Sequence, residues 1–539
     1  MSEEVDYVVI GSGSAGSVIA ARLSEDPQVS VLVLEAGGMD DKYFYRRPGA
    51  LGLVYQIPQL KKSADWGYKT VPLSGMDNRE MPYTRGRIVG GCSTVNGMLY
   101  VRGHRDNYDR WVELGCEGWG WDDLLPLFKR SEGHEDGPTD AHGGDGPLQV
   151  TRQQGCSPVS DAWVEAASRV TGAPVVSDFN GGDNEGLGTY HQTCANRRRS
   201  SASVAFLHPA LLERGNLQLR VGCLVSSLII EDGRCTGVRY MQDGEAKEVR
   251  VRSEVVLSAG AIGSPQILQL SGIGHPDHLK AVGIDTVHAL PGVGENLHDH
   301  LYVPLRFNAT QDTGHTSTAP HFLWGMFRDY FFDTGWFGKT FLEGGGFVKT
   351  TADQPRANLQ YLTIPWAYPE PNDDIMEDGV ISKTPSFTVM PILLYPKSRG
   401  SVRLRSSDPA AHPLIDPAYL VEDEDMELLL HGVKQSREIA LSEPVRKFLP
   451  SEAFPGPAVQ TDDQLRAHIR LAGKTVYHPV GSGKMGHDDL AVVDPQLRVH
   501  GISGLRIADA SIMPEIVGGN TNAPTICIGE KASDLIRGR

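Results

Sequence analysis

The chain has 539 residues, a net charge of −16 at pH 7 and 40% hydrophobic residues, which is enough apolar material for sizeable cores. The negative charge argues against nucleic acid or an anionic lipid surface as a partner, because both would repel the protein. The 7 cysteines form no CxxC pairs or His/Cys clusters in the sequence. They favour reduced, buried thiols over a disulfide framework or a zinc site, so no metal site is expected.

The N-terminal segment leaves no room for an export signal, because the first predicted strand begins within a few residues of Met1. No uninterrupted apolar run approaches the roughly twenty residues of a membrane span. The sequence therefore predicts a soluble, cytoplasmic protein without a transmembrane segment. It leaves the oligomeric state open, and a homo-oligomer is compatible with it.

The first predicted unit is a strand over residues 7–10, the glycine turn 11–16 (GSGSAG), a helix as far as Leu23, and a second strand over residues 29–34. The glycines let the backbone approach a pyrophosphate, which the N-terminus of the helix attracts. Glu35 follows the second strand, where a carboxylate can accept hydrogen bonds from an adenosine ribose. This unit predicts a dinucleotide site.

Further strands are predicted far along the chain. Residues 216–241 are interpreted as a meander, residues 254–260 as a near-continuous apolar strand, and residues 505–510 as a strand close to the C-terminus. Such distant strands can form one sheet, and the intervening segments must then form a second domain. Between residues 302 and 457, alternating segments predict an antiparallel sheet with helices over one face. The aromatic residues around 322–341 are interpreted as core or as walls of an apolar cavity.

The triplet His298-Asp299-His300 superficially resembles a metal-binding motif. Neighbouring side chains in an extended segment point to alternate sides, so one ion could not easily recruit all three. We therefore expect no metal at this triplet.

Two glycine-rich stretches carry a resemblance to a known family. Residues 86–103 (GRIVGGCSTVNGMLYVRG) resemble the first signature of the glucose-methanol-choline (GMC) family of FAD oxidoreductases. Residues 260–274 (GAIGSPQILQLSGIG) match the second signature at every constrained position. The resemblance covers essentially the whole chain, and it is strongest to the bacterial branch of alcohol dehydrogenases, choline dehydrogenases and hydroxymethylfurfural oxidases.

The resemblance implies an α+β fold of the GMC and p-hydroxybenzoate hydroxylase type. In this fold a Rossmann-like FAD-binding domain is interleaved with an antiparallel-sheet substrate domain. The expected boundaries are 1–301 for the main FAD-binding part, with cap insertions around 155–195, and 302–457 for the substrate domain. Residues 458–539 are expected to return to the FAD domain and to carry catalytic residues.

FAD is expected to be noncovalent, because Val95 stands where flavinylated choline oxidases, which resemble this loop, carry histidine. The residues that the resemblance assigns to the cofactor come from five separate segments. They are Gly11, Gly13, Ser14, Ala15 and Gly16; Glu35 and Ala36; Gly91, Asn96, Gly97 and Met98; Val225; and Asp509, Ala510 and Asn522.

Oxidation of an alcohol needs a base for the hydroxyl proton and an acceptor for the carbinol hydrogen, which flavin N5 takes as hydride. The resemblance assigns the base to His478, a residue type that is mostly neutral at pH 7 and so can accept a proton. Asn520 matches the family's second catalytic position, where an amide can hydrogen-bond the substrate oxygen. Asn522 lies only two residues away, so the swapped assignment stays open.

Three further residues are predicted near the substrate, namely Tyr477, Trp366 and Glu343. Glu343 either binds a cationic substrate or makes a structural hydrogen bond. The sequence thus predicts FAD-dependent oxidation of a primary alcohol with an apolar or aromatic body to its aldehyde, with O2 or a quinone as the acceptor. Two alternatives remain, a choline-type enzyme and a non-redox lyase that retains FAD.

Overall fold

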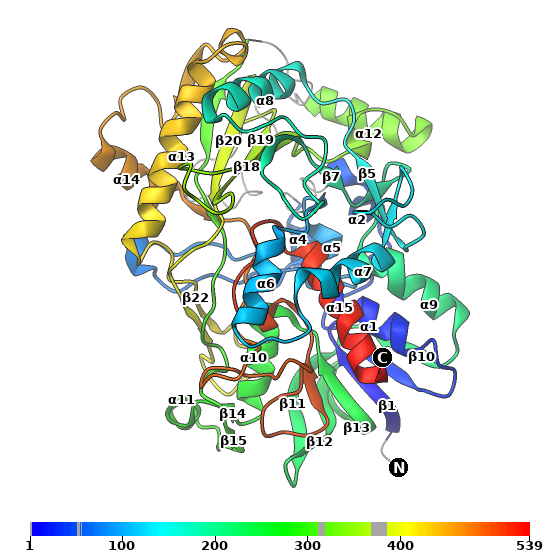
Figure 1. Ribbon diagram of the computed structural model, residues 1–539. Coiled ribbons are helices and arrows are strands. Elements are labelled where there is room, and N and C mark those ends of the chain that lie inside the picture. Colours follow the sequence, from blue (N-terminus) through cyan, green and yellow to red (C-terminus); the bar gives the residue numbers. More distant parts are fainter. Residues whose placement is uncertain (1–2, 51–53, 55–56, 311–318, 368–384, 539) are drawn as a thin grey trace.

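The computed structural model describes residues 3–50, 54, 57–310, 319–367 and 385–538. A mixed sheet lies in the lower half of Figure 1 and an antiparallel sheet in the upper half. Both chain ends lie beside the lower sheet, so the chain leaves that half and returns to it. The predicted α+β architecture is confirmed.

The lower sheet has the strand order β10-β2-β1-β13-β12-β11, and β25 also pairs with β13. Its strands are β1 (Glu3–Ile10), β2 (Val31–Leu34), β10 (Leu217–Arg220), β11 (Leu224–Glu231), β12 (Arg234–Gln242), β13 (Glu245–Leu257) and β25 (Leu505–Ile507). Strand β1 runs parallel to both β2 and β13, as a dinucleotide-binding unit requires. The predicted C-terminal strand joins this sheet through β25.

The predicted meander over residues 216–241 is wrong in its first strand. Strand β10 pairs parallel with β2 at one edge of the sheet, whereas β11 and β12 lie at the opposite edge. The antiparallel ribbon is instead β11-β12-β13. Strand β13 is long enough to pair antiparallel with β12 along its first half and parallel with β1 along most of its length.

Helix α1 (Ser14–Leu23) follows the glycine turn and packs against the C-terminal helix α15 (Asn522–Arg537). The two helices cross the lower sheet side by side in Figure 1. Arg22 donates two hydrogen bonds to the fully buried carboxylate of Glu530, at 3.0 and 2.8 Å. The chain's last helix thereby holds the first one in place.

The upper sheet follows the order β23-β17-β20-β19-β18-β6; β16 also pairs with β20, and β24 pairs with β16. Its strands are β6 (Gly186–Thr189), β16 (Leu301–Tyr302), β17 (Leu305–Asn308), β18 (Gly344–Val348), β19 (Leu359–Ile364), β20 (Ser386–Leu393), β23 (Ser451–Phe454) and β24 (Lys474–Thr475). Helices α8 (Pro158–Thr171) and α13 (Asp423–Leu441) pack on it and on each other (Figure 1). Strands β6 and β24 come from outside residues 302–457.

A third, smaller sheet has the strand order β3-β7-β5-β4. Its strands are β3 (Leu99–Tyr100), β4 (Glu132–His134), β5 (Leu148–Arg152) and β7 (His191–Gln192). Strand β3 lies within the first glycine-rich signature, residues 86–103, so this sheet supports that loop.

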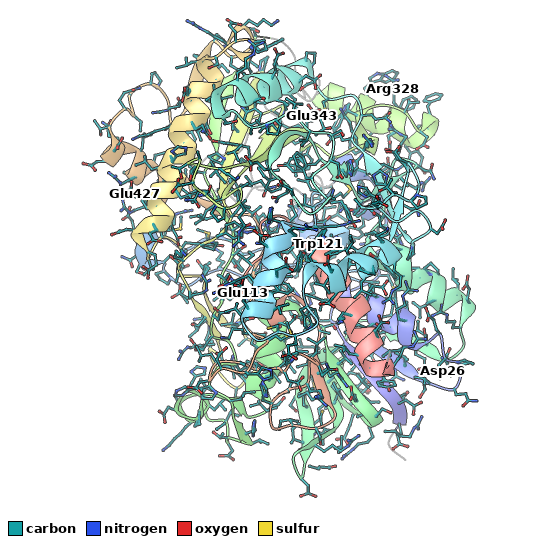
Figure 2. All side chains as sticks on the ribbon, in the orientation of Figure 1. Asp26, Glu113, Trp121, Arg328, Glu343 and Glu427 are labelled. Atoms are coloured by element: carbon teal, nitrogen blue, oxygen red, sulfur yellow. The ribbon has the colours of Figure 1, made fainter. Side chains whose placement is uncertain are left out.

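Five aromatic residues of helix α12 (Ala319–Phe332) are exposed, and their interpretation as core or cavity wall is wrong. Their exposed fractions lie between 42% and 65% for Trp324, Phe327, Tyr330, Phe331 and Phe332. The helix is instead attached by its buried Asp329, which forms ion pairs with Arg47 and Arg197. Arg328, which directly precedes Asp329, lies on the outer side of the helix in Figure 2.

None of the helices within the described ranges is both long and apolar enough to cross a bilayer.

Glu343 holds the N-terminus of α8. Its Oε2 accepts hydrogen bonds from the backbone N–H of Ser157 at 2.8 Å, from the Ser157 hydroxyl at 2.7 Å and from the Ser160 hydroxyl at 2.8 Å. The side chain is fully buried beside α8 (Figure 2). A carboxylate there also complements the positive end of the helix dipole. Of the two sequence-based interpretations of Glu343, the structure favours the structural hydrogen bond.

Replacing Glu343 with Ala should therefore lower the free energy of unfolding by about 3 kcal/mol, because buried donors at the α8 N-terminus lose their acceptor. Urea unfolding of the FAD-loaded protein measures this. Glu343→Gln, which keeps one acceptor oxygen, is the matched control and should lose less. An unchanged unfolding midpoint together with a raised KM for a cationic alcohol would contradict the structural role.

Candidate active site

A single cavity of about 330 Å³ runs from the glycine turn to His478. It is lined by most of the residues that the sequence singled out, although they come from distant segments. These are Gly11, Gly13, Ser14, Ala15, Glu35, Ala36, Gly91, Asn96, Gly97, Met98, Val225, Tyr477, His478, Asp509, Ala510, Asn520 and Asn522. Gly16, Glu343 and Trp366 are not part of this lining.

The three exceptions have separate structural reasons. A Cβ atom on Gly16 would lie 1.9 Å from the Gly11 carbonyl oxygen, so Gly16 allows the close packing of turn and helix. Glu343 is committed to α8, as described above. Trp366 packs on Phe341, with ring centroids 4.9 Å apart, and only Phe341 reaches the cavity.

The first signature loop touches the glycine turn. Gly91 has φ of +54°, and a Cβ atom there would lie 2.8 Å from the Cα of Gly13. Only glycine allows this approach. Further along the loop, the buried Arg199 donates to Asn96 Oδ1 at 2.7 Å, which fixes the amide at the cavity wall.

Glu35 lies at the end of β2, and its carboxylate is oriented by the glycine turn. It accepts hydrogen bonds from the backbone N–H and hydroxyl of Ser12, at 3.0 and 2.7 Å, and from the backbone N–H of Gly37 at 2.8 Å. Burial raises the pKa of Glu35. A carboxylate has about four acceptor positions, so these three bonds leave capacity for a ligand's hydroxyl groups.

Asp509 connects the C-terminal segment to helix α10 (Gly260–Leu270), which carries the second signature. Its carboxylate accepts from the Gly260 backbone N–H at 2.8 Å, the Ser264 hydroxyl at 2.6 Å and the Ser511 backbone N–H at 2.8 Å. Burial raises the pKa of Asp509. The carboxylate thus fixes the start of α10 beside the cavity.

The two neighbouring asparagines lie at different parts of the cavity. Asn522 accepts a hydrogen bond from the Ser14 hydroxyl at 2.8 Å, at the glycine turn. Asn520 Nδ2 lies 3.2 Å from His478 Nε2, and Asn520 Oδ1 accepts from Gln360 at 3.4 Å. The geometry therefore argues against swapping their roles.

His478 has a defined tautomer. His300 Nε2 donates to the carbonyl of Leu394 at 3.0 Å, so His300 Nδ1 is an acceptor. His478 Nδ1 lies 3.0 Å from it and must carry the proton. His478 Nε2 is consequently an unprotonated acceptor directed toward Asn520.

Asp299 fixes the backbone at His478. Its fully buried carboxylate accepts from the His478 backbone N–H at 2.8 Å, the Tyr83 hydroxyl at 2.8 Å, the Tyr419 hydroxyl at 2.6 Å and the Thr475 hydroxyl at 2.6 Å. Burial raises the pKa of Asp299. With all its acceptor positions used by protein donors, this carboxylate has a positioning role.

The pKa of His478 is held well below 6.5, chiefly by burial and further by His300 and by the Arg85 guanidinium. Burial also lowers the pKa of His300, to about 4. Both rings are therefore neutral at pH 7, and His478 Nε2 can accept a proton there.

The part of the lining contributed by the upper sheet and its neighbours is apolar. It includes Tyr302, Phe341, Leu362, Ile364, Met390 and Ile392. Among the lining residues that the structure describes, the carboxylates are Glu35 and Asp509, both engaged as above. Two non-glycine residues of the lining, Met98 and Tyr477, have φ of +64° and +65°, a strained conformation that is common at functional sites.

Three important residues escaped the sequence-based prediction. His300 and Asp299 were considered only as metal ligands, although the 298–300 triplet was the available signal, and none of the motifs discussed above pointed to Arg199. In the structure the side chains of the triplet do not converge on one point. His298 Nδ1 donates to the Asn296 carbonyl, and its Nε2 accepts from the Ile516 backbone N–H.

The site fits FAD in its chemistry. An adenine dinucleotide with a reactive distal ring requires three features, and the site has all of them. They are a buried carboxylate at the end of β2, a helix N-terminus behind a glycine turn, and a continuous cavity from there to His478. Gly13 faces the cavity with no other atom closer than 4.0 Å to a Cβ position, so the backbone is open to a ligand there.

Comparison with known proteins agrees with this geometry. The family model "GMC oxidoreductase" matches residues 5–302, and the model of its C-terminal domain matches residues 396–529. An oxygen-dependent choline dehydrogenase of Sinorhizobium fredii is 41% identical over 541 aligned positions, covering 99% of this chain and 96% of that protein.

Solved structures are also similar over the full length. Pyridoxine 4-oxidase from Mesorbium loti superimposes with a TM-score of 0.88 at 29% identity, covering 99% of each chain. A formate oxidase variant from Aspergillus oryzae, studied for modification of its FAD, gives a TM-score of 0.90 at 26% identity, covering 100% of this chain and 98% of the other. The chain therefore belongs to the GMC oxidoreductase family and is an FAD-dependent oxidoreductase acting on CH–OH donors.

Proposed function

We propose that this protein oxidises a primary alcohol to its aldehyde, with His478 as the base and Asn520 as the amide that positions the substrate oxygen. The observation that carries this proposal is the geometry at His478, whose Nε2 lies 3.2 Å from Asn520 Nδ2 inside the cavity while its Nδ1 lies 3.0 Å from His300. A protein that only bound a flavin would have no need for such a base.

In the proposed reaction the substrate hydroxyl lies between His478 Nε2 and Asn520 Nδ2. His478 accepts the hydroxyl proton, and Asn520 donates a hydrogen bond to the same oxygen, which orients the carbinol C–H bond. His300 stabilises the transient imidazolium by accepting from Nδ1. When bound, FAD supplies the acceptor for the carbinol hydrogen, as hydride.

We assign the cofactor to the lining residues of the glycine turn, the β2 end, the first signature loop, Val225 and the C-terminal segment. Glu35 would accept from the ribose, and the α1 N-terminus would attract the pyrophosphate. The position of Val95 in the lining, without a nucleophilic nitrogen, supports noncovalent binding. We retain boundaries at about 301 and 457, with β6 and β24 contributed to the substrate domain from outside them.

The substrate we propose has an apolar or aromatic body, because the upper-sheet part of the lining is apolar and Glu343 is engaged elsewhere. Choline is the second candidate, supported by the names of relatives at 41% identity. Tyr302 and Phe341 offer ring faces on which a quaternary ammonium could be stabilised. The electron acceptor is O2 or a quinone; the names of the relatives favour O2.

Replacing His478 with Ala should slow flavin reduction by a factor of about 10² to 10⁴ while leaving FAD bound. Rapid mixing under anaerobic conditions at saturating alcohol measures it. His478→Gln, which keeps an acceptor but cannot be protonated, should be equally slow, and the exposed His275→Ala serves as the unaffected control. A rate within about threefold of the parent would remove His478 from the base role.

The pH dependence follows from the lowered pKa of His478. Its neutral, active form persists above that pKa and is lost as the pH falls through it, so kcat/KM should be flat from pH 6.5 upward and fall only at more acidic pH. A kcat/KM profile between pH 4.5 and 8.5 in about half-unit steps tests this. An apparent pKa for the base above 7 would contradict the assigned environment.

Benzyl alcohol and 1-octanol should reduce the flavin with higher kcat/KM than choline or glucose, because the described lining offers few partners for a charge or for many hydroxyl groups. Parallel anaerobic reductions, each followed by reoxidation with air or a quinone, give both substrate and acceptor. An advantage of about tenfold or more for choline would overturn the apolar assignment.

A further inference from the structure

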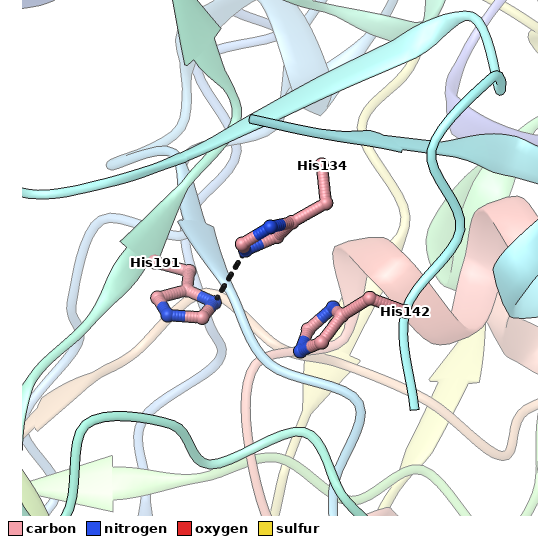
Figure 3. A group of neighbouring side chains, drawn as sticks. All are labelled: His134, His142 and His191. Carbon is pink, nitrogen blue, oxygen red and sulfur yellow. Dashed lines mark hydrogen bonds between the residues drawn. The ribbon is translucent and has the colours of Figure 1, made fainter. Parts of the chain in front are cut away.

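Three histidines that lie far apart in the sequence meet in the interior, away from the cavity of the active site. They are His134 at the end of β4, His142 in the following loop and His191 at the start of β7 (Figure 3). Their exposed fractions are 5%, 6% and 2%. One nitrogen of each lies within 4.8 Å of the others. No sequence motif indicates this cluster, because its members are spaced by eight and by forty-nine residues.

The carboxylate of Asp178 lies beside two of the three histidines. Asp178 Oδ2 lies 3.1 Å from His142 Nε2, and its Oδ1 lies 3.6 Å from His191 Nδ1. The remaining close approach, from His134 Nε2 to His191 Nδ1, is 3.4 Å. Ligands about 2.0–2.1 Å from a tetrahedral zinc ion are about 3.3–3.4 Å from one another, which matches the His134–His191 separation. The two Asp178 separations involve different oxygens, so one of them can be a further edge of such a tetrahedron.

On the sides that face away from the cluster, His142 and His191 make hydrogen bonds typical of metal-binding histidines. His142 Nδ1 lies 2.9 Å from the buried Glu132, which in turn pairs with Arg102 at 2.7 Å. His191 Nε2 lies 3.2 Å from the Ser177 carbonyl, which leaves Nδ1 as the free acceptor. Histidines that bind metals usually donate their second N–H to a carboxylate or a carbonyl in this way.

We propose that His134, His142, His191 and Asp178 form a structural zinc-binding site that is separate from the catalytic centre. Three imidazole nitrogens and one carboxylate oxygen are a donor set that suits zinc. The ion replaces one proton: His142 loses the proton on Nε2 to solvent, while the His134 proton moves from Nε2 to Nδ1. His134 Nδ1 then no longer accepts a hydrogen bond from the Asp136 backbone N–H. It donates instead to the Asp136 carboxylate, which lies 3.8 Å from it in this structure.

The site would stabilise the support of the flavin loop. His191 pairs with Tyr100 in the β7–β3 ladder, and β3 directly follows Met98. The next residue after β7, Thr193, donates its backbone N–H to the Met98 carbonyl at 2.8 Å. A zinc ion that ties β4, β7 and the Asp178 loop together would therefore restrict the strand that positions the Asn96–Met98 segment.

Metal analysis of the full-length, FAD-loaded protein tests the proposal. The protein is prepared without a His tag, incubated with zinc sulfate and then exchanged into metal-free buffer. We expect one zinc per chain, and X-ray absorption should give about three Zn–N distances of 2.0–2.1 Å and one oxygen. Zinc content below about 0.1 per chain would overturn the proposal, as would a coordination shell containing sulfur.

His142→Gln and His191→Asn should each reduce bound zinc at least tenfold and abolish the rise in thermal midpoint that zinc gives the parent. His468→Gln removes another buried histidine, in helix α14 (Asp462–Ala472), and should retain both zinc and the rise. Equal zinc in the parent and both cluster variants would place the ion elsewhere and refute the site. If a variant does not fold, the absorption spectrum of the parent decides.

Discussion

The buried carboxylate of Asp299 is the interaction on which the catalytic end of the cavity depends. Its bonds to Tyr83, Tyr419 and Thr475 hold three segments that are distant in the sequence, and its bond to the His478 backbone holds the base against them. An ionised carboxylate in this setting is tolerable only because four donors surround it, so the loss of any one of them would leave buried charge poorly compensated.

A short series of hydrogen bonds positions the other polar groups at this end of the cavity. The Leu394 carbonyl fixes His300, His300 fixes the tautomer of His478, and Gln360 orients the Asn520 amide that faces it. Burial keeps both imidazoles neutral. The strained φ of Tyr477, immediately before the base, is held by the Thr475 hydroxyl, which accepts from the Tyr477 backbone N–H at 2.7 Å. The site is thus organised before any substrate arrives.

The apolar wall comes mainly from strands of the upper sheet, whereas the proposed base and amide, His478 and Asn520, lie in loops of the C-terminal segment. The lower sheet and the returning C-terminal segment supply the dinucleotide turn, Asp509 and His478. Strands β19 and β20 of the upper sheet supply most of the apolar lining. Gln360 of β19 also orients Asn520, so the upper sheet contributes both to the apolar wall and to the position of the proposed amide.

The sequence by itself determined the elements whose chemistry is local. The glycine turn with Glu35 at the next strand end is legible because backbone geometry and spacing are fixed within one strand–turn–helix unit, and the two signatures and His478 stood out through motif resemblance. The α+β class followed from that resemblance, and the strand patterns spread over the chain agreed with it.

Only the tertiary structure decided what depends on contacts between distant segments. It paired β10 with β2 rather than with β11, turned the α12 aromatics outward, and committed Glu343 to the α8 N-terminus. It also separated Asn520 from Asn522 and brought His300 to His478. Hydrophobic pattern specifies that a side chain prefers burial or a strand, but not which partner across the fold will satisfy it, because that choice is made by the packing of the whole chain.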